Sequence, residues 1–257
     1  MNSQYKLEVA NVSDVGCKRP HNEDSTASNE ALGILVLADG MGGYKAGEVA
    51  SAIAVTGIYN DVVSGLKNSN PAGIDEDSGL DHHSILIRNA VNRANSSIYN
   101  TAQTDKQCQG MGTTVVTVIT YNDCISIAHV GDSRLYRIRS GDFKQITKDH
   151  SLVQELIDRG LFSPEEAEKN APKNLVTRAL GIDAKVEIDV IEDKLVNGDI
   201  YLLCSDGLTD MVKDEEIHLT LGKYSANLAH AADKLVEIAN KYGGKDNISV
   251  ILARVTD

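Results

Sequence analysis

The chain has 257 residues, of which 42% are hydrophobic and 24% charged, a balance typical of a globular protein large enough to bury a core. Its formal net charge is −12 without a visible basic stripe, which argues against nucleic-acid binding. Residues Met1–Tyr5 lack the apolar core of a signal peptide, and no apolar run approaches the ~20 residues of a membrane span. We therefore expect a cytoplasmic protein that does not cross a membrane.

Short β-branched or alternating runs predict strands, the first and the sixth with the weaker pattern. In chain order these runs are Val9–Val15, Leu32–Ala38, Thr113–Tyr121, Cys124–Val130, Arg134–Arg139, Val186–Ile191, Ile200–Cys204 and Ile248–Val255. Turn residues at Asn122-Asp123 and Ser140-Gly141 join consecutive runs closely. Such short links favour antiparallel sheet over parallel strand–helix–strand units.

Apolar residues at helical spacing predict three helices, Ala46–Leu66, Ser84–Ala102 and Asn227–Tyr242. The run Ser163-Pro164-Glu165-Glu166 predicts a helix start, with Ser163 as N-cap and Pro164 just inside. It lies in a charged insert, residues 149–179, between strands. Because no repeat or composition break interrupts the chain, we interpret residues 1–257 as a single α+β domain, a sheet core covered by helices.

Four aspartates stand at the ends of predicted strands. Asp39, Asp132 and Asp206 each follow an apolar run, and Asp246 directly precedes the last one. An Asp after a strand is most often only a turn residue, so position alone leaves their role open. If neighbouring strands bring them together, their mutual repulsion favours bound cations, and oxygen-only ligands suit Mg²⁺ or Mn²⁺.

The N-terminal segment Gly16–Asp24 places Arg19 a few residues ahead of two adjacent acids, Glu23 and Asp24. An arginine can hold a phosphate through two parallel hydrogen bonds, and the acids could join a cation cluster. The alternative interpretation is a solvated charged loop.

Six short motifs follow one another across nearly the whole chain. They are Gly16-x-x-Arg19-x-x-Asn22-Glu23-Asp24, Ala38-Asp39-Gly40-Met41-Gly42-Gly43, Gly112-Thr113-Thr114, Val130-Gly131-Asp132-Ser133-Arg134, Ser205-Asp206-Gly207-Leu208 and Gly244-Lys245-Asp246-Asn247. Each motif alone is weak, but the ordered set is specific. With its six motifs in this order, the chain resembles the PP2C (PPM) family of metal-dependent protein phosphatases. Its compact length is similar to that of the bacterial branch.

The resemblance implies a fold of two antiparallel sheets packed as a sandwich, flanked by helices on both sides (α-β-β-α). It also implies a centre with two Mn²⁺ or Mg²⁺ ions at one end of the sandwich. In that centre Asp39 bridges both ions, the Gly40 carbonyl and Glu23 support one ion, and Asp206 and Asp246 hold the other.

Further roles carried over from the resemblance concern the surroundings of the two ions. Asp24 lies close by and acts through water, and Arg19 binds the substrate phosphate. Bacterial relatives can bind a third ion, and the positions that match its ligands are Asp132, Asp206 and Asp210.

The implied activity is hydrolysis of phosphoserine and phosphothreonine in phosphorylated proteins, with a serine/threonine kinase and its targets as partners. Two cations bridge a water and make hydroxide available for in-line attack without a phosphoenzyme. A cysteine phosphatase needs a C-x5-R loop, which none of the four cysteines provides.

One position departs from the family pattern. Many eukaryotic members have a histidine after the Asp-Gly pair as general acid, whereas this chain has Met41, whose thioether cannot donate a proton. A coordinated water or His21 could supply the proton instead. The insert 149–179 corresponds to a mobile flap beside the site in bacterial relatives, and it either helps to choose substrates or serves as a packed helical cover.

Three other functions compete with this interpretation. A non-catalytic regulatory domain with the same fold usually loses metal-site acids, whereas Asp39, Asp206 and Asp246 are all present. A metal-dependent nuclease conflicts with the acidic balance. A phosphatase for an anti-sigma-factor antagonist usually carries a sensor domain, and none is visible in the sequence.

Overall fold

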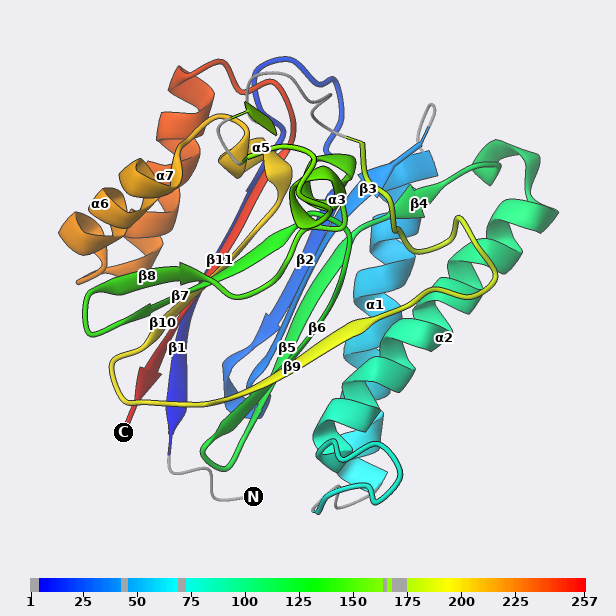
Figure 1. Ribbon diagram of the computed structural model, residues 1–257, viewed down its shortest axis with the longest axis horizontal. Coiled ribbons are helices and arrows are strands. Elements are labelled where there is room, and N and C mark those ends of the chain that lie inside the picture. The colour runs from blue at the N-terminus through cyan, green and yellow to red at the C-terminus, as the bar shows by residue number, and fades with distance from the viewer. Residues whose placement is uncertain (1–4, 43–45, 69–72, 164–165, 168–174) are drawn as a thin grey trace.

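The computed structural model describes residues 5–42, 46–68, 73–163, 166–167 and 175–257. Two antiparallel sheets lie face to face, and helices cover both outer faces (Figure 1). The α-β-β-α sandwich implied by the family resemblance is therefore confirmed.

Each sheet contains strands from distant parts of the chain. The first has the order β1 (Lys6–Asp14), β11 (Ile248–Thr256), β10 (Ile200–Cys204), β7 (Arg134–Arg139) and β8 (Asp142–Gln145). The second has the order β2 (Asp24–Asn29), β3 (Ile34–Met41), β5 (Val115–Tyr121), β6 (Cys124–Val130) and β9 (Asp189–Lys194), and the short β4 (Gly112–Thr113) pairs with β3. Because β1 pairs with β11, the two ends of the chain meet in one sheet.

The interior of the sandwich follows from the period-two alternation of the strands. In β3, Leu35 and Leu37 face the other sheet, where they join residues such as Leu203 and Ile251. The alternate residues Ile34 and Val36 face outward and pack beneath the helices. A strand buried on both faces explains why this run is almost wholly apolar.

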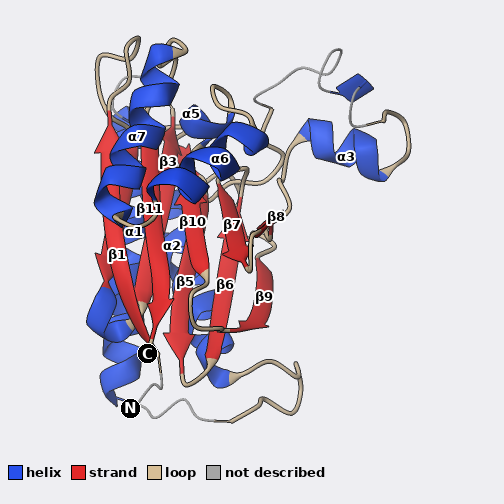
Figure 2. Cartoon of the chain, turned by 90° about the vertical axis from the view of Figure 1, so that its left-hand side faces the viewer, coloured by secondary structure: helices blue, strands red, loops and turns tan. Residues whose placement is uncertain are grey.

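The helices form the two outer layers. On the second sheet lie α1 (Ala46–Asn68) and α2 (His82–Thr104), and on the first lie α6 (Asp214–Tyr224) and α7 (Leu228–Lys241) (Figures 1 and 2). Helix α7 begins after Asn227, whose side chain accepts a hydrogen bond from the His230 N–H. Its buried side chains recur at helical spacing and cover the outer face of the sheet.

Helix α1 qualifies as a membrane span by length and composition alone, with 23 residues and 33% of its most apolar stretch buried. Core helices pass the same test, and Ala50, Ala54 and Ile58 of α1 are fully buried against the sheet and α2. The expected absence of a membrane span stays a prediction.

Most predicted elements are present with shifted ends, and several elements were missed, among them β2, β8 and α6. Strands β2 and β8 and helix α6 have too few apolar residues for their periodicity to stand out. Strand β3 continues beyond Ala38 because Gly40 and Met41 pair with β4. At the predicted hairpin, Ser140 and Gly141 both have positive φ, as a tight two-residue turn between β7 and β8 requires.

Only part of the insert 149–179 lies within the described residues. Helix α3 (Leu152–Asp158) starts after its N-cap Ser151 and stands out to one side of the sandwich (Figure 2). The predicted capping box is present: the Glu166 N–H donates to Ser163 Oγ, and the Ser163 N–H donates to the Glu166 carboxylate. Pro164, Glu165 and residues 168–174 lie outside the described residues.

Candidate metal centre

The predicted acids meet at the end of the sandwich where β3, β6 and β10 finish and β11 begins. Asp24 on β2 lies directly opposite Asp39 on β3. Asp206 is the first residue of α5 (Asp206–Thr209), directly after β10 and Ser205. The charges of Asp24, Asp132, Asp206 and Asp246 all raise the pKa of Asp39, so the four acids surround it.

The backbone around Asp39 is held by the Gly112-Thr113-Thr114 motif. The Asp39 N–H donates to Thr114 Oγ1 over 3.1 Å, and its carbonyl accepts from the Thr114 N–H and from Thr113 Oγ1. Thr114 Oγ1 also lies 2.7 Å from Ser133 Oγ, next to Asp132. These threonines therefore fix the end of β3 relative to the loop that carries Asp132.

Ser205 connects the two sheets at the centre. The Ser205 hydroxyl donates to Asp24 Oδ2 over 2.8 Å, and Ser205 Oγ itself accepts a hydrogen bond from the Ser249 N–H of β11. Asp24 is 8% exposed, and its pKa is raised to about 6, chiefly because burial disfavours the charge.

Asn247 anchors the N-terminal loop. Its Oδ1 accepts from the Glu23 N–H over 2.8 Å, and its Nδ2 donates to the carbonyls of Val15 and His21. The side chain is 4% exposed, so these bonds are shielded from water. Asn247 and Ser205 belong to the sequence motifs, but no role was predicted for them, because residue type alone does not show which distant backbone a side chain reaches.

Arg19 lies beside the centre, and its Nη2 donates to Asp246 Oδ2 over 2.7 Å. The arginine side chain is 48% exposed. Its guanidinium is therefore held by a carboxylate at one edge while the remainder is open to solvent. This is the arrangement expected of a group that meets an incoming anion.

Glu23 lies against the backbone of Gly40 and Gly47, where any larger residue would clash. A Cβ at Gly47, in the first turn of α1, would lie 3.0 Å from the Glu23 carboxyl carbon and 2.8 Å from the Gly40 carbonyl oxygen. A Cβ at Gly40 would lie 2.1 Å from the Gly47 carbonyl oxygen. The Gly40 carbonyl and the Glu23 carboxylate thus lie close together, as the carried-over ligand roles require.

The repulsion between the carboxylates of the centre favours the binding of cations. Burial, followed by the charges of neighbouring aspartates, raises the pKa of Asp39 and of Asp206 well above its usual value. Within the described part of the chain, Oδ1 of Asp24 and Oδ1 of Asp206 are buried without a hydrogen-bond partner. Partly buried, mutually repelling carboxylates with unused oxygens fit divalent cations that prefer oxygen ligands.

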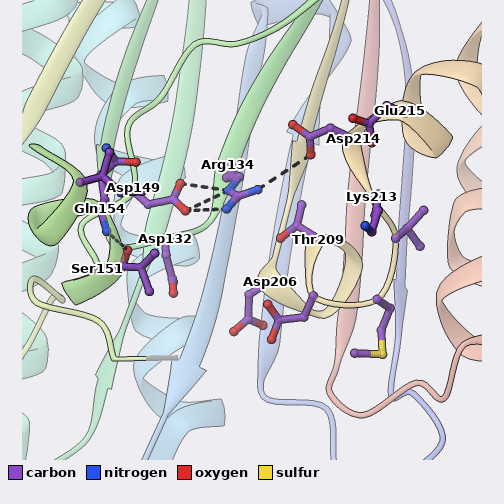
Figure 3. A pocket seen from close by; sticks show the side chains of 15 residues that line it. Asp132, Arg134, Asp149, Ser151, Gln154, Asp206, Thr209, Lys213, Asp214 and Glu215 are labelled. Atoms are coloured by element: carbon purple, nitrogen blue, oxygen red, sulfur yellow. Dashed lines mark hydrogen bonds and ion pairs between the residues drawn. The ribbon is translucent and has the colours of Figure 1, made fainter. Parts of the chain in front are cut away.

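The acids proposed for a third ion share one large pocket. Asp132, Asp206 and Asp210 line a cavity of about 720 Å³ between α3 and the segment that follows α5 (Figure 3). Above them, Arg134 donates to both carboxylate oxygens of Asp149. Arg134 belongs to one of the recognised motifs, and the structure gives it this ion pair in the pocket wall.

A second group of possible ligands was not found from the sequence. Nitrogens of His129 and His150 and an oxygen of Asp189 lie within 4.8 Å of one another. The first two side chains are buried, and Arg178 binds Asp189 over 2.8 Å. The residues come from β6, the insert and β9, and no sequence motif connects them.

The two candidates for a general acid differ in position. Met41 is the last residue of β3, paired with Gly112. His21 is exposed in the N-terminal loop, and its charge influences the pKa of Glu23, which burial raises. The role of His21 stays a prediction.

The fold, the acidic centre and the adjacent arginine define the class of metal-dependent phosphatases. Residues 18–252 match the family model described as protein phosphatase 2C, and the chain belongs to this family.

Individual relatives come from bacteria. The chain is 39% identical over 252 residues to the serine/threonine protein phosphatase PstP of Mycobacterium tuberculosis, covering 98% of this chain and 45% of PstP. It is 38% identical to the serine/threonine phosphatase stp of Listeria monocytogenes, covering 93% of this chain and 92% of that protein. The solved catalytic domain of PstP in complex with two manganese ions is similar, with a TM-score of 0.81, 37% identity and coverage of 99% and 100% of the two chains. This chain thus spans about half the length of PstP.

Proposed function

We propose that this chain is a metal-dependent protein phosphatase that hydrolyses phosphoserine and phosphothreonine. The observation that carries the proposal is the group of partly buried, mutually repelling carboxylates around Asp39, with a half-exposed arginine beside it. The names of the relatives, serine/threonine phosphatases, support the same activity.

The residues around the centre have separate tasks in this proposal. Asp39 would serve both cations, Glu23 and the Gly40 carbonyl would hold one of them, and Asp206 and Asp246 would hold the other. Bound divalent cations supply Lewis acidity, which brings the pKa of water close to neutrality. Arg19 binds the phosphoryl oxygens, orients the phosphorus for in-line attack and stabilises the charge that develops on it.

The supporting residues keep this geometry rigid. Thr113 and Thr114 fix the backbone of Asp39, Ser205 orients Asp24, and Asn247 holds the loop that presents Arg19 and Glu23. Because Met41 cannot donate a proton, the leaving oxygen takes its proton from water or from His21.

The choice of cation and the number of ions belong to the proposal. All the ligands are oxygens, which Mn²⁺ and Mg²⁺ both accept. The PstP complex with two manganese ions supports two core ions. Asp132, Asp206 and Asp210 line the same pocket, which supports a third ion.

The biological setting is likewise proposed. We infer a single domain that acts in the cytoplasm on phosphorylated proteins, among them a serine/threonine kinase and its targets, and binds neither nucleic acid nor membrane. Helix α3 of the insert forms one wall of the pocket beside the acids. This position supports a role of the insert in choosing substrates.

The test is phosphate release from a phosphothreonine peptide, with Mn²⁺ and with excess chelator. We expect release that requires the cation and that is lost in Asp206→Asn. The matched control is Asp233→Asn, which removes an exposed carboxylate on α7 and should leave the rate unchanged. Absence of release by the folded wild-type protein in Mn²⁺ would favour the regulatory-domain alternative.

A further inference from the structure

The loop that carries Asp132 is hydrogen-bonded to one buried histidine, His150. The His150 N–H donates to the Gly131 carbonyl over 2.9 Å, and the Gly131 N–H donates to His150 Nδ1 over 3.1 Å. Gly131 directly precedes Asp132 and has a φ of +106°. Backbone and ring of His150 thus bind both polar groups of the residue next to a proposed cation ligand.

The ring of His150 is itself held in place. It stacks on His129 with ring centroids 4.8 Å apart, and its Nε2 lies 3.4 Å from Asp189 Oδ2. Asp189 is fixed in turn by Arg178. At 4% exposure, the His150 side chain has little freedom to leave this position.

The hydrogen bond from Gly131 also determines the tautomer of His150. A backbone N–H can only donate, so Nδ1 carries the lone pair and the neutral ring has its proton on Nε2. A metal at Nε2 would have to displace that proton while Nδ1 still accepts from Gly131, which leaves an imidazolate. The group of His129, His150 and Asp189 is therefore better suited to hold the loop than to hold an ion.

The opposite side of the loop has its own attachment. Ser133 Oγ lies 2.7 Å from Thr114 Oγ1, which also accepts from the Asp39 N–H. Ser133 thus ties the loop to the core of the centre, while His150 fixes the residue on the other side of Asp132. Replacement of the His150 side chain would remove the hydrogen bond from the Gly131 N–H, whereas the backbone bond to the Gly131 carbonyl and the Ser133 attachment would remain.

We propose that His150 is a positioning residue that holds Asp132 in place for the third cation of the centre. This inference rests on the proposed function, because the role of Asp132 does. Outer residues that orient metal ligands typically change metal affinity by about 10- to 100-fold when they are removed. Because Asp132 belongs only to the third set, the effect should be confined to the third cation.

The experiment compares two replacements of similar size. His150→Asn keeps an acceptor for the Gly131 N–H, whereas His150→Leu fills the volume without one. His83→Leu is the matched control, because His83 is also buried and stacked on an aromatic ring, Tyr121, on the helix-covered side of the second sheet. Thermal melts establish that each variant is folded.

Mn²⁺ binding is measured by calorimetry, and Asp132→Asn identifies the binding event that belongs to the third site. We expect this event to weaken about tenfold or more in His150→Leu, to be largely restored in His150→Asn, and to be unchanged in His83→Leu. The affinities of the other binding events should stay unchanged.

Two results would overturn the inference while leaving the proposed function intact: equal third-site affinity in wild type and His150→Leu, or equal losses in the Leu and Asn variants. If wild type shows no binding event that Asp132→Asn removes, the third site and this role both fall. Phosphate release by wild type tests the proposed function separately.

Discussion

Replacement of Asp24 by Asn should stabilise the metal-free protein, although it removes a residue of the proposed centre. The pKa of Asp24 is raised from 3.8 to about 6, mainly by burial. A carboxyl with a raised folded-state pKa contributes its full stability below pH 3.8 and loses it as the pH rises through 6. At pH 7.5 the ionised group therefore costs the folded state about 3 kcal/mol, and at pH 5 roughly half of that.

Urea unfolding in excess chelator measures this cost. Asp24→Asn should exceed wild type in unfolding free energy by about 3 kcal/mol at pH 7.5 and by roughly half as much at pH 5. Comparing the two proteins at each pH cancels the titration of groups that Asp24 does not influence, such as His150, whose pKa burial lowers to about 4. Saturating Mn²⁺ should shrink the difference, because bound cations stabilise the ionised form of Asp24. A variant less stable than wild type in chelator at pH 7.5 would refute this reasoning.

Three further predictions concern the surroundings of the centre. Asn247→Ala leaves the Glu23 N–H and two carbonyls without their partner, so the free energy of unfolding should fall by about 2–3 kcal/mol in urea titrations. Turnover should fall as well, and unchanged turnover would mean that Asn247 does not orient the site. His21→Ala should lower turnover by less than about tenfold, and a loss beyond about a thousandfold with metal binding intact would make His21 the general acid. Apart from the three proposed cation ligands, the pocket beside the centre is lined by three carboxylates and two cationic side chains, so a phosphothreonine peptide with a nearby Arg should have a lower KM than the same peptide with Glu, and Asp214→Asn should narrow the difference in KM; equal KM values for the two peptides would exclude charge selection there.

The sequence was most informative where one strand face or one helix face is buried. Strands β6, β7 and β10 were predicted with their observed ends, because their side chains alternate or are continuously apolar. Strand β2 was missed because its sequence, DSTASN, consists of small polar residues that become a strand through pairing with β3. Pairing partners are a property of the folded chain and leave no local pattern.

The centre was predictable in outline because buried strands deliver the residues at their ends to fixed points. This reasoning placed Asp132, Asp206 and Asp246 at strand ends, whereas Asp39 lies inside β3, which β4 prolongs. The supporting contacts were not predictable. Asn247 reaches Val15 across 232 positions and Ser205 reaches Asp24 across 181, and such distances carry no sequence signature.

The most direct test of the central claim is to locate the cation itself, by anomalous diffraction at the manganese edge from crystals grown with Mn²⁺. We expect manganese peaks among Asp39, Asp206 and Asp246, beside Arg19. Peaks at His129, His150 and Asp189 with none among the aspartates would contradict it.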